Sequence, residues 1–516
     1  MQKGQVETVA AIDVGSNSLR MMIAQITPGG EVIPLEDLLR PTHIGRDTFA
    51  YGRIQLQSIH DTCDTLKGFT KLMHDYRVKH YRAVSTSGIR EAENREYVLE
   101  QIRLRTGLSV EVINNAQERF LMFKAIRNHL PKSMKISNKG TLIVDIGSGG
   151  VEISVYSKGA LKFTEYIRVG SLRLREILAD LESMTLDFPS IVEEFVESRI
   201  DFLKSSLEKL DINNYIGLGG ELRTIIRLCY QDQSNSEEKL INKGMIAKLY
   251  ARVHSMTTEQ IIQEYGLDRN QAGILLPSII IFYRLLQMTD AEGIYAPMVS
   301  LRHGIMADIA DEHFNSNGKR EGINDILSSV INIGQKYNFD EKHCKYVENI
   351  CLTIFDKTSK IHRMGDKEKL YLQVACLLHD VGKHVNLNLH DIHSYNIIRF
   401  TNIMGFSNRE LDIVANIARY HSDEVPQLSH ENYFVLSAED RIIVSKLAAI
   451  LKIGESLDIS HKRKVNQIDV SISGRELHFK VQCSEDLLLE EWNFADTALF
   501  FEEVMGYKPV IKRRRW

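Results

Sequence analysis

The sequence is poor in cysteine and in long apolar segments. Its 516 residues include six cysteines without CxxC spacing, which excludes a disulfide-rich secreted scaffold and favours reduced thiols in the cytoplasm. No apolar signal segment precedes the first expected strand, and the Ile- and Leu-rich stretch from Ala272 to Leu286 contains Pro277 and Arg284. Because this stretch is shorter than a membrane span, we predict a buried core helix there and no contact with a membrane.

An excess of charge of one sign is also lacking. The 64 basic residues nearly balance the 68 acidic ones, and the formal net charge is −4. We therefore expect no global positive field that would recruit nucleic acid, so a polyanionic ligand must be held by local basic groups. Apolar residues make up 43% of the chain and charged residues 26%, as in ordinary globular proteins, and the length predicts two to four domains.

A five-residue pattern of the form apolar-Asp-apolar-Gly-Ser occurs twice, at Ile12–Ser16 and at Val144–Ser148. An apolar run precedes each copy and a run typical of a β-strand follows it, so each copy predicts a strand, a tight turn and a second strand. Glycine lets backbone amides approach an anion without a Cβ between them. Two such turns facing each other would hold a chain of phosphates, and Asp13 and Asp145, at the strand ends, would hold Mg²⁺ against it.

The order of strands and helices also repeats, which indicates a duplicated α/β unit with the site between its halves. Polar residues from Pro131 to Gly140 separate the copies, and a polar, glycine-containing stretch from Glu312 to Gly322 indicates an interdomain linker. The chain beyond it is expected to be helical to about Ser460. Alternating apolar residues then indicate a small α+β module, with a helix near Asp496–Met505 and a solvated basic tail at Lys512–Arg515. The predicted segments are 1–130, 131–315, 322–463 and 464–516.

The segment Ala11–Arg20 resembles, almost letter for letter, the first motif of the exopolyphosphatase/guanosine pentaphosphate phosphohydrolase (Ppx/GppA) family. This family belongs to the superfamily of acetate and sugar kinases, heat-shock chaperones and actin, and the similarity covers approximately residues 7–310. The resemblance implies an α/β plus all-α fold class, with two actin-like (ribonuclease H-like) ATPase-fold subdomains, an HD-like helical domain and the α+β module. It also implies phosphate binding by Gly15, Ser16, Asn17 and Ser18.

A second block, Val84–Asn94, resembles a family segment in which Arg90 corresponds to the arginine that contacts polyphosphate. A guanidinium group suits this role because its fork of donors matches two phosphate oxygens. Gly88 stands where the family usually has alanine. The alternative interpretation of Arg90 is a surface salt bridge to Glu91 or Glu93.

The third block, Ile113–Arg119, resembles a family pattern that places Glu118 as the base that activates water. Gln117 replaces the glutamate that usually precedes it, and Arg119 replaces an alanine. Taken without the resemblance, Glu118 is typical of an exposed helix residue.

The fourth block, Asp145–Glu152, resembles a family loop whose two carboxylates bind metal or orient water, so Asp145 and Glu152 are predicted as catalytic residues and, with Asp13, as Mg²⁺ ligands. The loop residues Gly147, Ser148, Gly149 and Gly150 are predicted to bind phosphate. Four positions depart from the family here and downstream: Ser148 and Gly150 have exchanged places, Val151 replaces threonine, and Glu221 adds negative charge to a later glycine loop.

In the helical segment, His343, His379, Asp380 and Asp458 follow the order H…HD…D, which resembles the metal-dependent HD phosphohydrolases. Imidazole nitrogen with carboxylate oxygen suits Mn²⁺, Fe²⁺, Mg²⁺ or Zn²⁺, and His390, His393 and His421 would add ligands for a second ion. The alternative is an HD-like domain that has no catalytic role, as in long members of the phosphatase family.

The resulting hypothesis is a cytoplasmic, Mg²⁺-dependent hydrolase that releases orthophosphate from the end of inorganic polyphosphate or removes the 5'-phosphate of guanosine pentaphosphate. The family implies a homodimer, with guanosine tetraphosphate as a substrate or inhibitor. Two alternatives stay open. One is a phosphotransferase like the sugar and acetate kinases, and the other is a sensor that binds polyphosphate or guanosine tetraphosphate with little turnover.

Overall fold

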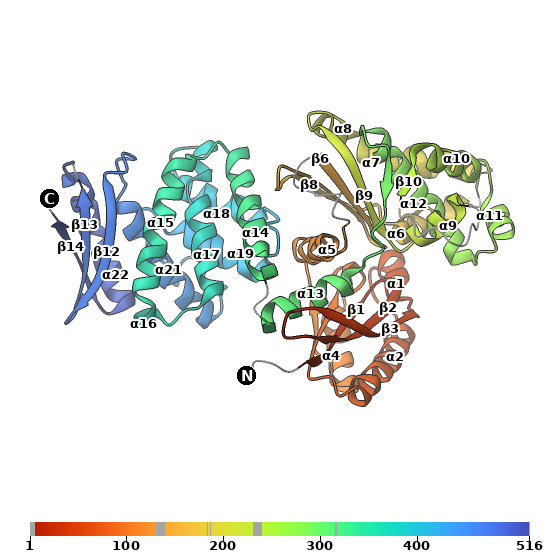
Figure 1. Cartoon of the computed structure of the whole chain (residues 1–516), viewed down its shortest axis with the longest axis horizontal. Helices are drawn as coiled ribbons and strands as arrows, with labels where there is room; N and C mark the ends of the chain where they lie inside the picture. Colours follow the sequence, from red (N-terminus) through yellow and green to blue (C-terminus); the bar gives the residue numbers. More distant parts are fainter. Residues whose placement is uncertain are drawn as a thin grey trace. The chain divides into compact units, whose positions relative to one another are not determined.

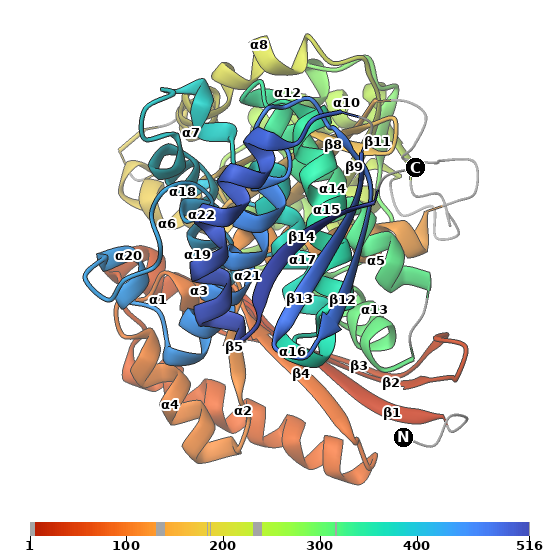
Figure 2. The same cartoon turned by 90° about the vertical axis from the view of Figure 1, so that its left-hand side faces the viewer.

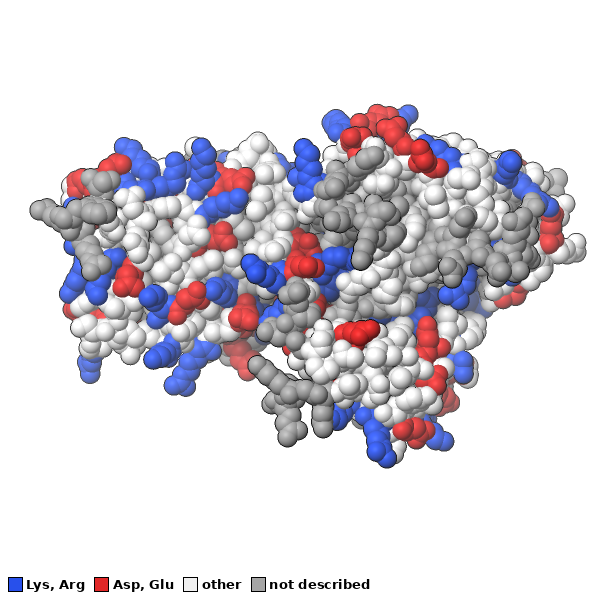
Figure 3. Space-filling model, in the orientation of Figure 1, with Lys and Arg blue, Asp and Glu red and all other residues white. Residues whose placement is uncertain are grey.

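The structure is a computed structural model that describes residues 6–130, 140–182, 184–185, 187–230, 240–314, 317–483 and 485–514. The chain divides into two compact units, Met1–Gly322 and Ile323–Trp516 (Figure 1). No helix in the described part of the chain has the length and apolar character needed to cross a membrane. On the face shown in Figure 3, basic and acidic side chains are interspersed, in keeping with the nearly balanced charge of the sequence.

The first unit begins with a five-stranded sheet in the order β3-β2-β1-β4-β5. Its strands are β1 (Glu7–Val14), β2 (Ser18–Ile26), β3 (Val32–Pro41), β4 (His80–Ser85) and β5 (Val110–Val112). Helices α2 (Leu56–Asp75) and α4 (Arg95–Thr106) cover one face, where alternate side chains of β1 and β2 join the hydrophobic core. The opposite face is covered by α13 (Leu301–Phe314), which lies beside α5 (Asn115–His129) in both views (Figures 1 and 2).

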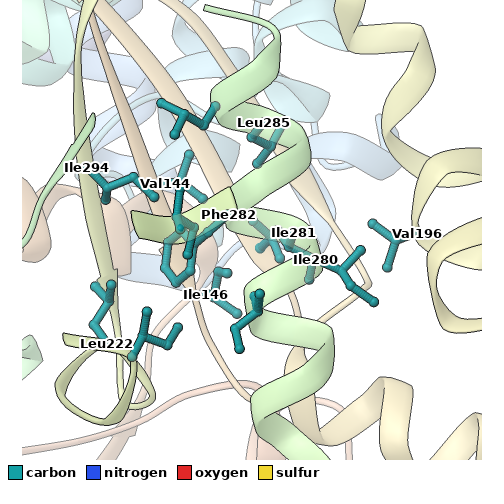
Figure 4. Packing of buried hydrophobic residues seen from close by; sticks show 14 of the residues in the cluster. Val144, Ile146, Val196, Leu222, Ile280, Ile281, Phe282, Leu285 and Ile294 are labelled. Atoms are coloured by element: carbon teal, nitrogen blue, oxygen red, sulfur yellow. The ribbon is translucent and has the colours of Figure 1, made fainter. Parts of the chain in front are cut away.

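A six-stranded sheet in the order β10-β11-β9-β6-β7-β8 forms the other half of the first unit. Its strands are β6 (Gly140–Ile146), β7 (Val151–Ser157), β8 (Ala160–Ile167), β9 (Ile212–Gly219), β10 (Leu240–Asn242) and β11 (Gly293–Tyr295). The predicted core helix is confirmed as α12 (Arg269–Gln287), whose Phe282 packs near Val144 and Ile146 of β6 (Figure 4). The remaining helices of this half are α6 (Ser171–Glu182), α7 (Phe188–Ile200), α8 (Lys204–Leu207), α9 (Leu222–Cys229), α10 (Lys243–His254) and α11 (Thr258–Tyr265).

The two sheets repeat one topology, which confirms the predicted duplication. In each sheet an antiparallel three-strand meander is followed by a strand parallel to its first member, giving β3-β2-β1-β4 and β8-β7-β6-β9. The register pairs Asp13 with Arg20 across the first hairpin and Asp145 with Glu152 across the second. The repeated aspartates therefore occupy equivalent strand ends.

The linker predicted from Glu312 to Gly322 ends where the two compact units divide, but its described residues are helical. Helix α13 continues to Phe314 and α14 (Asn317–Lys336) begins at Asn317, while residues 315–316 lie outside the described residues. A Cβ on Gly322 would lie 3.1 Å from the Phe120 ring of α5. This glycine serves close helix packing, which composition alone cannot distinguish from a linker. Residues 131–139 of the other polar stretch lie outside the described residues.

The second unit is a helical domain followed by a small α+β module. Its larger helices are α15 (Glu341–Lys357), α17 (Asp366–Leu378), α18 (His390–Phe400), α19 (Asn408–Arg419) and α21 (Ala438–Ser456). The module has the sheet β12-β13-β14, with β12 (Val465–Ser473), β13 (Glu476–Cys483) and β14 (Lys508–Arg514), and α22 (Leu488–Met505) packs on it (Figure 2). The predicted tail is a strand as far as Arg514, because β14 pairs in parallel with β13, although the side chains of Lys512 and Arg513 are exposed as predicted.

Candidate active site

A cavity of about 180 Å³ in the first unit is lined by both hairpin turns. The predicted residues that line it are Asp13, Gly15, Ser16, Asn17, Ser18, Arg90, Glu118, Asp145, Gly147, Ser148, Gly149, Gly150 and Glu152. The two halves of the duplication thus contribute to one space, and the sequence-predicted residues of this unit are brought together.

The two turns approach each other at Ser87, the first residue of the short helix α3 (Ser87–Arg90). Its hydroxyl lies 3.1 Å from the hydroxyl of Ser16 in the first turn. In the second turn, a Cβ on Gly149 would lie only 2.5 Å from Oγ of Ser87. Glycine at 149 is therefore needed for the two turns to come this close, and Ser87 is the residue through which they meet.

Arg90 and Glu118 form an ion pair at one side of the cavity, with Nη1 of Arg90 3.3 Å from Oε2 of Glu118. Arg90 also donates to the Ile113 carbonyl at 2.7 Å and to the Asn115 side chain. Glu91 was one possible partner for a surface salt bridge with Arg90. Its carboxylate instead accepts a hydrogen bond from Arg173 at 2.7 Å. Burial raises the pKa of Glu118, the Arg90 guanidinium opposes this shift, and the Asp13 carboxylate adds to it.

Glu118 lies in the first turn of α5, and Gln117 takes part in the cap of that helix. The amide of Gln117 donates to the Asn114 side chain at 2.9 Å, and the Asn114 amide donates to Oε1 of Gln117 at 3.1 Å. This reciprocal capping box satisfies two backbone donors at the start of the helix. Gln117 therefore holds in place the turn that carries Glu118.

Arg119, which replaces the alanine of the family pattern, contacts the predicted site residue Glu152. Nη1 of Arg119 donates to Oε1 of Glu152 at 2.6 Å and to the Thr164 hydroxyl at 2.7 Å, and that hydroxyl donates to Glu152 at 2.8 Å. The Arg119 side chain is only 5% exposed and that of Glu152 15%. Glu152 thus has two protein partners in the cavity.

The cavity lining contains five carboxylates, of Asp13, Glu118, Asp145, Glu152 and Glu221, and three guanidinium groups, of Arg20, Arg90 and Arg119. Burial raises the pKa of Asp145 to about 7, with contributions from Glu118 and Glu152, and it raises that of Glu221 to about 7 and that of Asp13 above its usual value. Arg20 opposes each of these shifts. Among the described residues, none forms a hydrogen bond or ion pair with the carboxylate of Asp13 or Asp145.

The unpaired carboxylates of Asp13 and Asp145, one from each hairpin, fit a divalent cation with oxygen ligands, such as Mg²⁺. The described residues of the first unit do not bring ligand atoms of three His, Cys, Asp or Glu side chains within 4.8 Å of one another. A cation here would therefore need further oxygen ligands besides these carboxylates, such as hydroxyls, backbone carbonyls, water or phosphate.

Sequence reasoning did not assign a role to Arg20, Thr86, Ser87, Arg119 or Tyr166, all of which line the cavity. Arg20 closes the first motif, but its place opposite Asp13 follows from strand register. Ser87 lies in the second motif, beside the predicted Arg90.

In the second unit, ligand atoms of His343, His379 and Asp380 lie within 4.8 Å of one another. Asp458, predicted with them as a ligand, instead accepts a hydrogen bond from Nδ1 of His343 at 2.8 Å. Glu455, one helical turn earlier, lies 3.1 Å from the other ring nitrogen. The sequence spacing did not distinguish these two acids.

The duplicated meander sheets, with a cavity between their hairpin turns, define an actin-like ATPase fold. A family model described as Ppx/GppA phosphatase family matches residues 22–313, and one described as Ppx/GppA phosphatase, domain III, matches residues 327–502. The chain therefore belongs to the Ppx/GppA phosphatase family, as its motifs predicted.

Similar proteins agree with this assignment. The guanosine-5'-triphosphate,3'-diphosphate pyrophosphatase of Vibrio vulnificus is 19% identical over 482 residues, which cover 92% of each chain. That of Photobacterium profundum is 20% identical over 469 residues, covering 89% of this chain and 88% of the relative. A solved Ppx/GppA structure from Aquifex aeolicus has a TM-score of 0.50 and 26% identity, covering 60% of this chain and 99% of that chain. An exopolyphosphatase structure from Cytophaga hutchinsonii has a TM-score of 0.53 and 20% identity, covering 59% and 98%.

The packing of Gly88 gives a first prediction. A Cβ at this position would lie 2.8 Å from Oγ of Ser16 and 2.9 Å from the Ile44 side chain. We expect Gly88→Ala, which restores the residue usual in the family, to lower the free energy of unfolding by about 1 to 3 kcal/mol through overpacking. Chemical denaturation should be followed by far-UV circular dichroism, because both tryptophans, Trp492 and Trp516, lie in the second unit.

The matched control for this prediction is Gly68→Ala in α2, where a new Cβ meets no atom within 4 Å. We expect this variant to be as stable as the wild type or slightly more stable, since alanine favours a helix. Equal stability of Gly88→Ala and the wild type would contradict the packing argument.

The Arg119–Glu152 pair gives a second prediction. Arg119→Met should lower the free energy of unfolding by about 3 to 5 kcal/mol, because it leaves a buried carboxylate without its cation. The double variant with Glu152→Gln should be less destabilised than the two single effects added together. The control is Arg103→Met, whose pair with Glu100 is about half exposed and is expected to contribute less than about 1 kcal/mol. Additive single effects would show that Arg119 and Glu152 are not coupled.

Proposed function

We propose that this protein hydrolyses a terminal phosphoanhydride bond, in inorganic polyphosphate or in guanosine pentaphosphate, and releases orthophosphate. The observation that carries the proposal is the single cavity lined by both glycine-containing turns, by Arg90 and by Glu118. Membership of a phosphatase family and the names of the Vibrio and Photobacterium relatives support it.

The phosphate chain would be held by the two turns. Backbone amides and hydroxyls of Gly15–Ser18 and of Gly147–Gly150 are the donors from the two halves, and donors fixed in advance stabilise charge that develops during reaction. Arg90 lies beside them and is held by Ile113 and Asn115, so part of its guanidinium orientation is set before substrate binds. The short distance between the turns at Ser87 suits an unbranched anionic chain.

Glu118 is the proposed base that orients or deprotonates the attacking water. A general base works best with a pKa near the working pH, and burial shifts the pKa of Glu118 upward in that direction. Arg90 opposes this shift, so Arg90 links phosphate binding to the proton affinity of the base. The alternative of an exposed helix residue is disfavoured by its place in the cavity lining.

Magnesium would be held by Asp13 and Asp145, whose carboxylates are unpaired among the described residues, and it would supply positive charge against the bound phosphates. Glu152 was predicted as a third ligand. Its contacts with Arg119 and Thr164 favour a role in which it reaches the ion through water or orients water near it. A homodimer and a cytoplasmic location stay predictions.

A sensor that binds the phosphate chain with little turnover is the second candidate. Two departures in the cavity favour it: Arg119 pairs with Glu152, and Glu221 adds a carboxylate. Binding of polyphosphate or guanosine tetraphosphate without phosphate release would support the sensor. Transfer of phosphate to an added acceptor would instead support the kinase-like alternative.

The proposal predicts release of orthophosphate from long-chain polyphosphate, triphosphate or guanosine pentaphosphate in the presence of Mg²⁺. A chelator should abolish this release, since the carboxylate-rich cavity needs a cation to hold an anion. The measurement is a colorimetric phosphate assay with each substrate, with and without Mg²⁺. Absence of release from all three substrates would overturn the hydrolase.

The role of Glu118 gives a separate prediction. Glu118→Gln should retain the far-UV circular dichroism spectrum and lose at least about a hundredfold in turnover, the lower range for removal of a general base. The matched control is Glu96→Gln, which changes an exposed acid in the first turn of another helix, α4. Turnover of Glu118→Gln equal to that of the control would remove Glu118 from the mechanism.

A further inference from the structure

Four imidazole rings in the helical domain surround the carboxylate of Asp380. The Nε2 atoms of His343 and His379 lie 3.9 and 3.6 Å from Oδ2, and those of His421 and His390 lie 3.5 and 3.7 Å from Oδ1. One pair of rings thus faces each carboxylate oxygen.

The other ring nitrogen of each histidine, Nδ1, already has a hydrogen-bond partner. Nδ1 of His343 is 2.8 Å from the Asp458 carboxylate, and the Nδ1 atoms of His379, His390 and His421 lie 2.8, 3.1 and 2.7 Å from backbone carbonyls. A carbonyl or carboxylate on one ring nitrogen fixes the tautomer and orients the other nitrogen, which is the usual arrangement for metal-binding histidine. Asp458 acts here through His343.

The centre of this cluster is buried and incompletely bonded. His379 is fully buried and Asp380 is 4% exposed, yet Nε2 of His379 and Oδ1 of Asp380 have no hydrogen bond of acceptable geometry. Glu455 lies 3.1 Å from Nε2 of His343 and 3.2 Å from Nε2 of His379. Buried polar atoms without partners are costly, so they point to a ligand between them.

The distances help to decide between hydrogen bonding and metal binding. The separations of 3.5 to 3.9 Å between the imidazoles and Asp380 exceed those of normal hydrogen bonds. Two ligands bound tetrahedrally to one ion at about 2.1 Å lie roughly 3.4 Å apart. The contacts of Asp380 with the four imidazoles are therefore spaced more like those of a ligand set than like direct hydrogen bonds, whereas His390 and His421 lie 3.1 Å apart through their Nε2 atoms.

We propose that the helical domain binds two divalent transition-metal ions bridged by Asp380. The first ion would take Nε2 of His343 and His379, Oδ2 of Asp380 and a carboxylate oxygen of Glu455. The second would take Nε2 of His390 and His421 with Oδ1 of Asp380. Ligand atoms of His343, His379 and Asp380, and those of Asp380, His390 and His421, each lie within 4.8 Å of one another. This mixture of imidazole and carboxylate suits Mn²⁺, Fe²⁺, Co²⁺ or Zn²⁺.

Two neighbouring side chains refine the proposal. Lys383 donates to Oδ2 of Asp380 at 2.5 Å, but its side chain is 34% exposed and is free to turn toward solvent when an ion binds. His390 is 22% exposed, whereas His343 and His379 are almost completely buried. The second ion is therefore closer to solvent and should be the first removed by a chelator.

The test uses the full chain, stripped of metal, loaded separately with Mn²⁺, Co²⁺ or Zn²⁺, freed of excess ion and measured by elemental analysis. For at least one metal we expect the wild type to hold two ions more per chain than Asp380→Asn, a difference that does not depend on a cation bound in the first unit. His421→Gln and His390→Gln should each retain one ion, as should His379→Gln, and Asp380→Asn should lose both. The matched control is His393→Gln, on the same helix as His390 but outside the ligand groups, which should retain two.

Stabilisation by metal gives a second measurement that does not depend on activity. Ions that bind the folded domain raise its unfolding temperature, which differential scanning calorimetry measures. We expect a rise for the wild type and His393→Gln that is smaller for His421→Gln. A difference of fewer than two ions between the wild type and Asp380→Asn with every metal, or equal loss in the His393→Gln control, would overturn the proposal. Phosphate release by the first unit has no bearing on either readout.

Discussion

The close approach of two glycine-containing turns is the constraint on which the first unit depends. Ser87 lies between them, 3.1 Å from Ser16 on one side and against Gly149 on the other. This contact leaves no room for a side chain at 149, and it joins strand ends that belong to different sheets. The two halves meet at the Ser87 hydroxyl and the edge of the Phe49 ring, and glycine at 149 allows this approach, so that donors of both halves line one cavity.

The register of the two hairpins decides which charged side chains lie opposite each other in the cavity. The first hairpin sets Asp13 opposite Arg20, whereas the second sets Asp145 opposite another acid, Glu152. The second hairpin therefore needs positive charge from elsewhere, and Arg119 supplies it to Glu152. Asp13 and Asp145 keep unpaired carboxylates with raised pKa values among the described residues. An anionic substrate and a cation would complement this arrangement together better than either would alone.

Much of this architecture could be predicted from the sequence, because strong local patterns specify it. The repeated aspartate–glycine motif predicted both hairpins, and the apolar run at Ala272–Leu286 predicted α12. The rest depends on tertiary contacts. Gly322 resembled a linker residue but permits close packing against Phe120, and the C-terminal basic residues form a strand because β13 offers them an edge. Likewise, sequence spacing could not show that Asp458 faces the outer nitrogen of His343 while Glu455 faces the inner one.

The departures from the family motifs are not independent of one another. Gln117 caps α5, Glu118 and Arg119 follow it in the first two turns, and Arg119 reaches Glu152 across the cavity. The same short segment thus positions the proposed base and partly neutralises an acid of the opposite hairpin. A change at one of these positions alters both the charge and the orientation of the others, so they are best understood as one coupled set. The residues that differ from the family motifs therefore change the charge around the cavity, but the cavity itself is kept.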